Sequence, residues 1–171
     1  MSQYTRSFDN SKRENMISSL GGFAMAAPVA NSPATRYAPE PLVNFNSYDQ
    51  RKRLSGSSLT AFFKIMELWK VRDEDAKLLL GGVSNEPFYE MKKNQKDKVL
   101  DVDQMYRISY LLGIFKAINI LHGQQLADRW AQIPNDGPVF HGQKPLQYMI
   151  DGGLPTFQDV RRLLEGQIQG T

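Results

Sequence analysis

The pattern of apolar and polar residues divides the chain into two parts near residue 55. Residues 1–54 have no sustained apolar period, and four prolines fall between residues 28 and 41. Proline lacks the backbone N–H that a helix needs and restricts the residue before it. The pattern therefore predicts a disordered tail over residues 1–54, with at most a short helix over residues 12–20. An arm that becomes ordered on a partner is the alternative that this pattern leaves open.

From Leu59 onward, apolar residues recur every three or four positions, as they do in amphipathic helices. This spacing predicts a helix over residues 59–69, a short helix over 76–80 and another over 85–94. Three acidic residues precede the short helix, where the positive end of the helix dipole favours them. Ser84 is the predicted N-cap of the following helix, because its hydroxyl can accept from a free backbone N–H.

The second half of the chain predicts further helices. Asp101 or Asp103 begins a long helix, and shorter turns follow before Pro134. A helix that starts at Pro145 is closed by a pair of glycines, and a last helix has Thr156 as its predicted N-cap. No segment alternates as a strand does. The folded part is therefore predicted to be all-α.

Composition favours binding over catalysis. The sequence has no cysteine, which excludes disulfides, thiol nucleophiles and cysteine-based metal sites. Its two histidines, His122 and His141, lie next to glycines, and no nucleophile motif such as G-x-S-x-G accompanies them. A hydrogen-bonding role in a loop is favoured for both over a catalytic one. We therefore expect a protein that is not an enzyme and that carries no metal and no cofactor.

Positive charge is concentrated in the first part of the chain. The net charge is +3, and residues 1–54 carry seven Lys or Arg against four Asp or Glu. This asymmetry suits a polyanion contacted from one side. No apolar run is long enough to span a membrane. Residues 16–30 resemble a signal peptide, but serines and glycines interrupt the apolar stretch. We expect a cytoplasmic protein with no membrane contact.

Residues 73–93 combine two short helices with a glycine turn, Gly81 and Gly82, which is the arrangement of a helix-turn-helix. In such a motif the second helix presents polar side chains to DNA, and nearby lysines contact phosphates. The residues predicted to bind DNA are Ser84, Asn85, Tyr89, Lys92, Lys93, Lys96 and Lys98. The same spacing fits a helical hairpin whose lysine-rich end is merely solvated.

Two groups of residues resemble a known family. The first resembles the Xre-like helix-turn-helix of antitoxins and consists of Trp69, Lys77, Leu78, Leu79, Leu80, Gly81, Gly82, Val83, Ser84, Pro87, Phe88, Val102, Arg107, Ile108, Ser109, Leu112, Gly113 and Ile114. The second resembles the toxin-binding module shared by Xre, MbcA and ParS antitoxins and consists of Trp130, Pro134, Asn135, Gly142, Pro145, Leu146, Met149, Gly152, Val160, Arg161, Arg162, Leu163 and Leu164. Together they cover residues 58–170 in the family's order. The long tail and the loop at residues 137–142 do not carry the resemblance.

The resemblance implies an N-terminal helix-turn-helix bundle over residues 55–122 and a small helical toxin-binding module over residues 123–171. It implies an antitoxin of a type II toxin–antitoxin system, which neutralises a cognate RES-domain, NAD-consuming toxin by occluding its active site in a hetero-oligomer. It also implies repression of the shared operon through operator DNA, and we expect the antitoxin to self-associate. The alternative is a stand-alone helix-turn-helix transcriptional regulator with a C-terminal dimerisation or protein-interaction module.

The last helix is expected to lie over the toxin's NAD cleft. An arginine fork suits a carboxylate in that cleft, and a tyrosine keeps one end in water. Trp130 and Met149 are expected to be core residues of the module. The residues predicted to contact the toxin are Tyr148, Phe157, Arg161, Arg162, Leu164 and Glu165. For the two arginines, spacing alone leaves a solvated helix face as the alternative.

Overall fold

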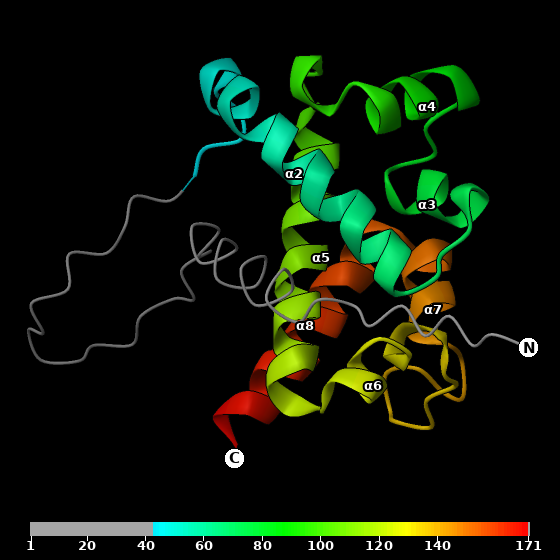
Figure 1. Cartoon of the computed structure of the whole chain (residues 1–171). Helices are drawn as coiled ribbons and strands as arrows, with labels where there is room; N and C mark the ends of the chain where they lie inside the picture. Colours follow the sequence, from blue (N-terminus) through cyan, green and yellow to red (C-terminus); the bar gives the residue numbers. More distant parts are fainter. Residues whose placement is uncertain (1–42, 171) are drawn as a thin grey trace, which may run out of the picture. The chain divides into compact units, whose positions relative to one another are not determined.

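A computed structural model describes residues 43–170, and this part of the chain is all-α, as predicted (Figure 1). The structure contains α2 (Tyr48–Leu68), α3 (Asp73–Leu79), α4 (Asn85–Lys93), η2 (Gln95–Asp97), α5 (Val102–Leu121), α6 (Gln124–Ala127), η3 (Trp130–Gln132), α7 (Pro145–Gly152) and α8 (Leu154–Gln169). No strand occurs within residues 43–170. The short helix predicted over residues 12–20 and the segment resembling a signal peptide lie outside the described residues.

The first described helix begins earlier than the sequence pattern predicts. α2 starts at Tyr48, where the Ser47 side chain accepts from the backbone N–H of Gln50. Phe45, just before it, is buried against the ring of Tyr106. The prediction of a disordered tail up to residue 54 is therefore wrong for residues 44–54, which belong to a compact unit beginning at residue 44. The pattern missed these first turns of α2 because their residues are mostly polar.

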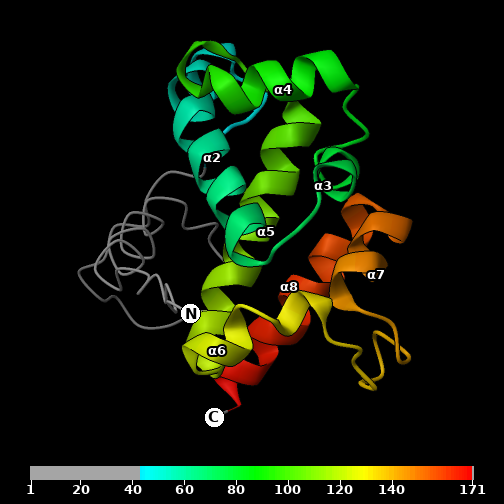
Figure 2. The same ribbon diagram turned by 45° about the vertical axis from the view of Figure 1, so that its right-hand side comes forward.

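α5 is the central helix of this unit. It packs against α2 on one side and against α8 on another, as Figures 1 and 2 both show. The ring centres of Trp69, which follows α2, and Phe115 of α5 lie 6.1 Å apart. Burial of such aromatic side chains is the main source of stability in a small helical domain. The expectation that Trp130 and Met149 are core residues is confirmed, because both are buried.

Helix starts follow the predicted caps only in part. Asp101 accepts from the backbone N–H of Gln104, and the Gln104 side chain accepts from the N–H of Asp101, forming a capping box at α5. The prediction that Thr156 caps the last helix is wrong, because α8 starts at Leu154. Gly153 precedes it with a φ of 63°, and the Thr156 hydroxyl donates to the Gly153 carbonyl at 2.7 Å.

The two predicted modules share one core. α5 ends at Leu121, next to the predicted boundary between residues 122 and 123. α8, which lies beyond that boundary, nevertheless packs along α5 and buries Phe157, Val160 and Leu164. The C-terminal helices therefore complete the core of the helices before them.

None of the helices between residues 43 and 170 combines the length and the apolar character needed to cross a membrane.

Candidate functional site

The turn between α3 and α4 depends on two consecutive glycines. Gly81 and Gly82 have φ values of 99° and 77°, a region that side chains rarely adopt. The backbone N–H of Gly82 donates to the carbonyl of Lys77 at 2.9 Å, and that of Val83 donates to the same carbonyl at 3.2 Å. These bonds close the end of α3 before α4 begins at Asn85. The sequence prediction of a glycine turn here is confirmed.

α4 is held to the core by one aromatic side chain. Phe88 is completely buried, and its ring centre lies 5.5 Å from that of Phe63 in α2. It is the one buried residue of α4, and Tyr89 next to it is 48% exposed. α4 lies across one end of the helical bundle (Figures 1 and 2), and it contacts α2 at Phe63, in the second half of that helix. Its polar face is therefore presented to solvent on a rigid support.

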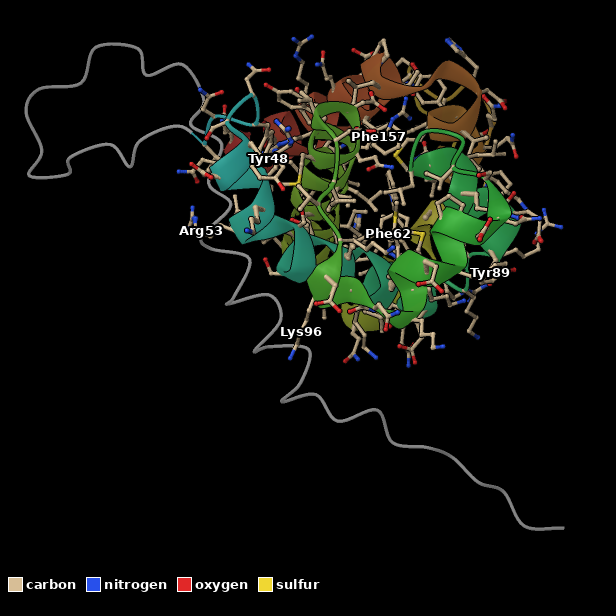
Figure 3. The ribbon with its side chains drawn as sticks, turned by 90° about the horizontal axis from the view of Figure 1, so that it is seen from above. Tyr48, Arg53, Phe62, Tyr89, Lys96 and Phe157 are labelled. Atoms are coloured by element: carbon tan, nitrogen blue, oxygen red, sulfur yellow. The ribbon has the colours of Figure 1, made fainter. Side chains whose placement is uncertain are left out.

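Most of the residues predicted to bind DNA are exposed. Ser84, Asn85, Tyr89, Lys92, Lys93 and Lys96 are exposed, and Lys98 is half-buried. Figure 3 shows Tyr89 and Lys96 at the edge of the molecule, whereas Phe62 lies inside. Ser84 stands at the N-cap position of α4, but its side chain forms no capping hydrogen bond, so that detail of the prediction is wrong.

Two of these residues also join α3 to α4. The Lys92 ammonium lies 2.7 and 2.9 Å from the two carboxylate oxygens of Asp73 at the start of α3. The Asn85 side-chain oxygen accepts from the ammonium of Lys77 at 2.6 Å. Both contacts are exposed, so they orient the side chains without burying them. A DNA contact by Lys92 would compete with Asp73.

The remaining lysines have no such competitor. Lys93, Lys96 and Lys98 form no ion pair with any residue between positions 43 and 170. Lys96 belongs to η2, which packs against α2. These ammonium groups are thus held on folded backbone without a direct ion pair, although the exposed Asp97 lies between Lys96 and Lys98 in the sequence.

A second basic segment lies in α2, in a region that the sequence pattern assigned to the tail. Arg51 is used internally, since its guanidinium donates to the carbonyls of Phe45 at 2.7 Å and Asn46 at 3.1 Å. The next two residues, Lys52 and Arg53, are exposed. The sequence signal for these two residues is the run of three basic residues at positions 51–53. It does not enter the predicted DNA-binding set, because the sequence pattern assigns the segment to a disordered tail.

Two of the residues predicted to contact a toxin are core residues. Phe157 and Leu164 are 0% and 1% exposed, and they face α5. The prediction that they form part of a binding surface is therefore wrong for the folded chain. Both belong to the apolar face of α8, and the structure uses that face for packing.

Arg161 joins α8 to α5. Its Nε donates to the Glu165 carboxylate at 2.6 Å, and its guanidinium lies 6.0 Å from the ring centre of Tyr110. A Cβ at Gly113 would lie 2.7 Å from the guanidinium carbon, so the glycine allows this close approach. Only 14% of the Arg161 side chain is exposed, whereas Arg162 is exposed.

Tyr148 occupies an intermediate position. Its ring centre lies 5.5 Å from that of the buried Phe140, and it is half-buried. Glu165 is half-buried as well. The surface that the toxin-binding prediction leaves on the folded chain therefore consists of Arg162 and the exposed parts of Tyr148, Arg161 and Glu165.

The titratable residues between positions 43 and 170 do not form a metal centre. No group of three or more His, Asp or Glu side chains in that range could hold a metal ion. His122 is the C-cap of α5, and His141 is exposed in a loop with a φ of 49°.

A side-chain hydrogen bond to Asp75, together with the negative charge of Asp75, raises the pKa of Arg72. That pair lies at the start of α3.

Comparison with known proteins gives one relationship. No family model matches the chain, and no solved structure matches it. The protein named "Uncharacterized protein y4oB" from Sinorhizobium fredii is 34% identical over 115 residues, which cover 67% of this chain and 86% of that protein. The chain therefore belongs to the same family as protein y4oB of Sinorhizobium fredii.

Proposed function

We propose that this protein is the antitoxin of a type II toxin–antitoxin system. It binds operator DNA through α3 and α4, and it neutralises a cognate RES-domain, NAD-consuming toxin through its C-terminal helices. The observation that supports this proposal most strongly is the way in which α4 is attached to the core. Phe88 alone is buried, while the polar residues of the same helix are exposed except for Glu90, which is half-buried.

The DNA-binding part follows from this geometry. A recognition helix must present one face to the major groove while the other face is held by the domain. Asn85 and Tyr89 lie on the exposed part of α4, where an amide can read an adenine edge. Lys93 is the last residue of α4 and Lys96 follows in η2, where ammonium groups can contact phosphates.

The neutralising part rests on α8. Its inner face is fixed against α5 by Phe157 and Leu164, and Arg162 projects from the outer face. A rigid helix with an exposed arginine suits insertion toward a carboxylate in a cofactor cleft, because the guanidinium fork pairs with both oxygens. Arg162 is accordingly the proposed contact with the toxin, and Arg161 holds α8 against α5.

The test is co-expression with the RES-type reading frame that should adjoin this gene. The two proteins should co-purify, and NAD in the cells should be preserved only when the antitoxin is present. DNA from upstream of the gene should be shifted by the antitoxin in an electrophoretic assay. Absence of co-purification together with unprotected NAD would contradict the neutralising role.

A specific observation favours the second candidate, a stand-alone helix-turn-helix regulator. α8 packs along α5 and completes a single core with the helices before it. C-terminal helices that only complete the domain, or that mediate dimerisation, would have this same arrangement. DNA binding without any toxin partner would support this second function.

A further inference from the structure

We propose that the DNA-binding surface continues past α4 onto the start of α2, where Lys52 and Arg53 contact backbone phosphates beside the recognition helix. The inference rests on the proposed DNA binding by α4. It adds a second phosphate-binding element from a helix that lies outside the predicted helix-turn-helix of residues 73–93.

The packing of η2 on α2 carries the proposal. A Cβ at Gly56 in α2 would lie 3.4 Å from the Cα of Lys96 and 3.5 Å from the carbonyl oxygen of Gln95. One turn further along α2, the Thr60 hydroxyl donates to the side-chain oxygen of Gln95 at 2.6 Å. η2 therefore lies on the stripe of α2 that runs through residues 56 and 60.

Lys52 and Arg53 belong to the same stripe. They precede Gly56 by four and three residues, the spacings that place helical side chains on one face. Figure 3 shows Arg53 at the left edge and Lys96 at the lower edge of the molecule, both at its periphery. The basic residues of α2 thus extend the surface that starts at the end of α4.

We call the exposed Lys52, Arg53, Lys93 and Lys96 the basic face. None of the four forms an ion pair with a residue between positions 43 and 170, although Asp49 and Asp97 are exposed nearby. Among residues 43–170, the Arg53 side chain makes one hydrogen bond, to the side-chain oxygen of Gln50 at 2.9 Å, and the rest of its guanidinium makes no other hydrogen bond in that range.

The arrangement of the basic face fits the backbone of a DNA duplex. Its charges come from three elements in succession, namely the end of α4, η2 and the start of α2. When a recognition helix lies in the major groove, the elements beyond its end meet the flanking phosphate backbone. Each cation that neutralises a phosphate releases counterions and adds to affinity without reading the sequence.

The experiment compares salt dependence for matched double variants. Binding of the full chain to a random-sequence duplex, and to DNA from upstream of its gene, is followed by fluorescence anisotropy over a series of NaCl concentrations. Lys52→Ala/Arg53→Ala should lower the slope of log K against log salt by about two units, since each phosphate contact contributes about 0.9. The loss should be the same on both duplexes.

The control removes the same charge elsewhere. Lys116→Ala/Lys144→Ala deletes two exposed lysines of α5 and the α7 cap, and its slope should equal that of the parent. The charge-preserving variant Arg53→Lys should also keep the parent slope. Circular dichroism on every variant checks that the helices are intact, and Lys52→Gln/Arg53→Gln replaces the alanine variant if that one is unfolded.

The outcomes separate the two proposals. A parent slope in Lys52→Ala/Arg53→Ala overturns the role of α2 and leaves DNA binding by α4 intact. An equal loss in the Lys116→Ala/Lys144→Ala control also overturns it, because net charge alone then explains the effect. A parent chain that binds neither duplex at low salt overturns both the proposed DNA binding and this inference.

Discussion

Helices α4 and α8 are attached to the core in different ways, and the difference explains which surface predictions survive in the fold. α4 buries only Phe88, and every polar residue chosen from it for DNA binding is exposed. α8 buries Phe157, Val160 and Leu164 and also lays Arg161 against α5. A helix with one buried contact offers most of its surface to a partner, whereas a helix with several offers only a narrow outer face.

The largest expected effect is the loss of the single buried contact of α4. Phe88→Ala should lower the free energy of unfolding by about 3–5 kcal/mol, because it removes a fully buried ring and leaves a cavity. Amide hydrogen exchange over residues 85–93 should rise more than exchange over α8. Urea unfolding and exchange mass spectrometry measure both quantities.

The neighbouring Tyr89→Ala serves as the control, because Tyr89 is half exposed and its substitution should change stability by less than about 1 kcal/mol. Uniform exchange across both helices in Phe88→Ala would show that α4 has further support.

The second effect concerns the outer face of α8. Arg162→Ala should weaken binding to the proposed RES toxin by about 2 kcal/mol, about 30-fold, if Arg162 is an interface anchor. Arg161→Ala should weaken the complex less, since its guanidinium already contacts Tyr110 and Glu165. Isothermal titration calorimetry with the purified toxin compares the two. A stronger loss for Arg161→Ala would reverse the assignment of inner and outer arginine.

A third, smaller effect tests the joint between α5 and α8. Gly113→Ala should raise the free energy of unfolding by up to about 1 kcal/mol through helix propensity. In a chain that keeps Arg161, however, the new Cβ would displace the Arg161 guanidinium. We expect that gain to appear only in an Arg161→Ala background, which gives a coupling of about 1 kcal/mol in a double-mutant cycle. Additive free energies in thermal unfolding would show that the two residues do not interact.

The smallest effect concerns the ion pair between α3 and α4. Asp73→Asn should change stability by less than about 1 kcal/mol, because exposed ion pairs contribute little. It should free Lys92 for DNA and raise the salt slope by about one unit. Asp159→Asn removes the same charge from an exposed position of α8 and is the matched control. Equal slopes for the two variants would mean that Asp73 does not compete with DNA.

Local sequence determined the helices and their order from α3 onward. The glycine turn at residues 81 and 82, the capping box of α5 and the proline at the start of α7 all act within a few residues. Such short-range signals need no knowledge of the fold. The start of α2 escaped this reasoning because its buried face contains Ser55 and Ser58 in place of large apolar residues.

Only the tertiary structure decided which side chains remain free on those helices. Adjacent helical residues differ in direction by about 100°, so Arg161 and Arg162 look equivalent until the position of α5 is known. α5 packs against the side of α8 that carries Arg161, and Gly113 of α5 leaves room for the Arg161 guanidinium. Arg162 therefore remains exposed on the outer side of α8. The same contact between distant segments turns Phe157 into core, because burial depends on which helix packs opposite and periodicity reports only one helix at a time.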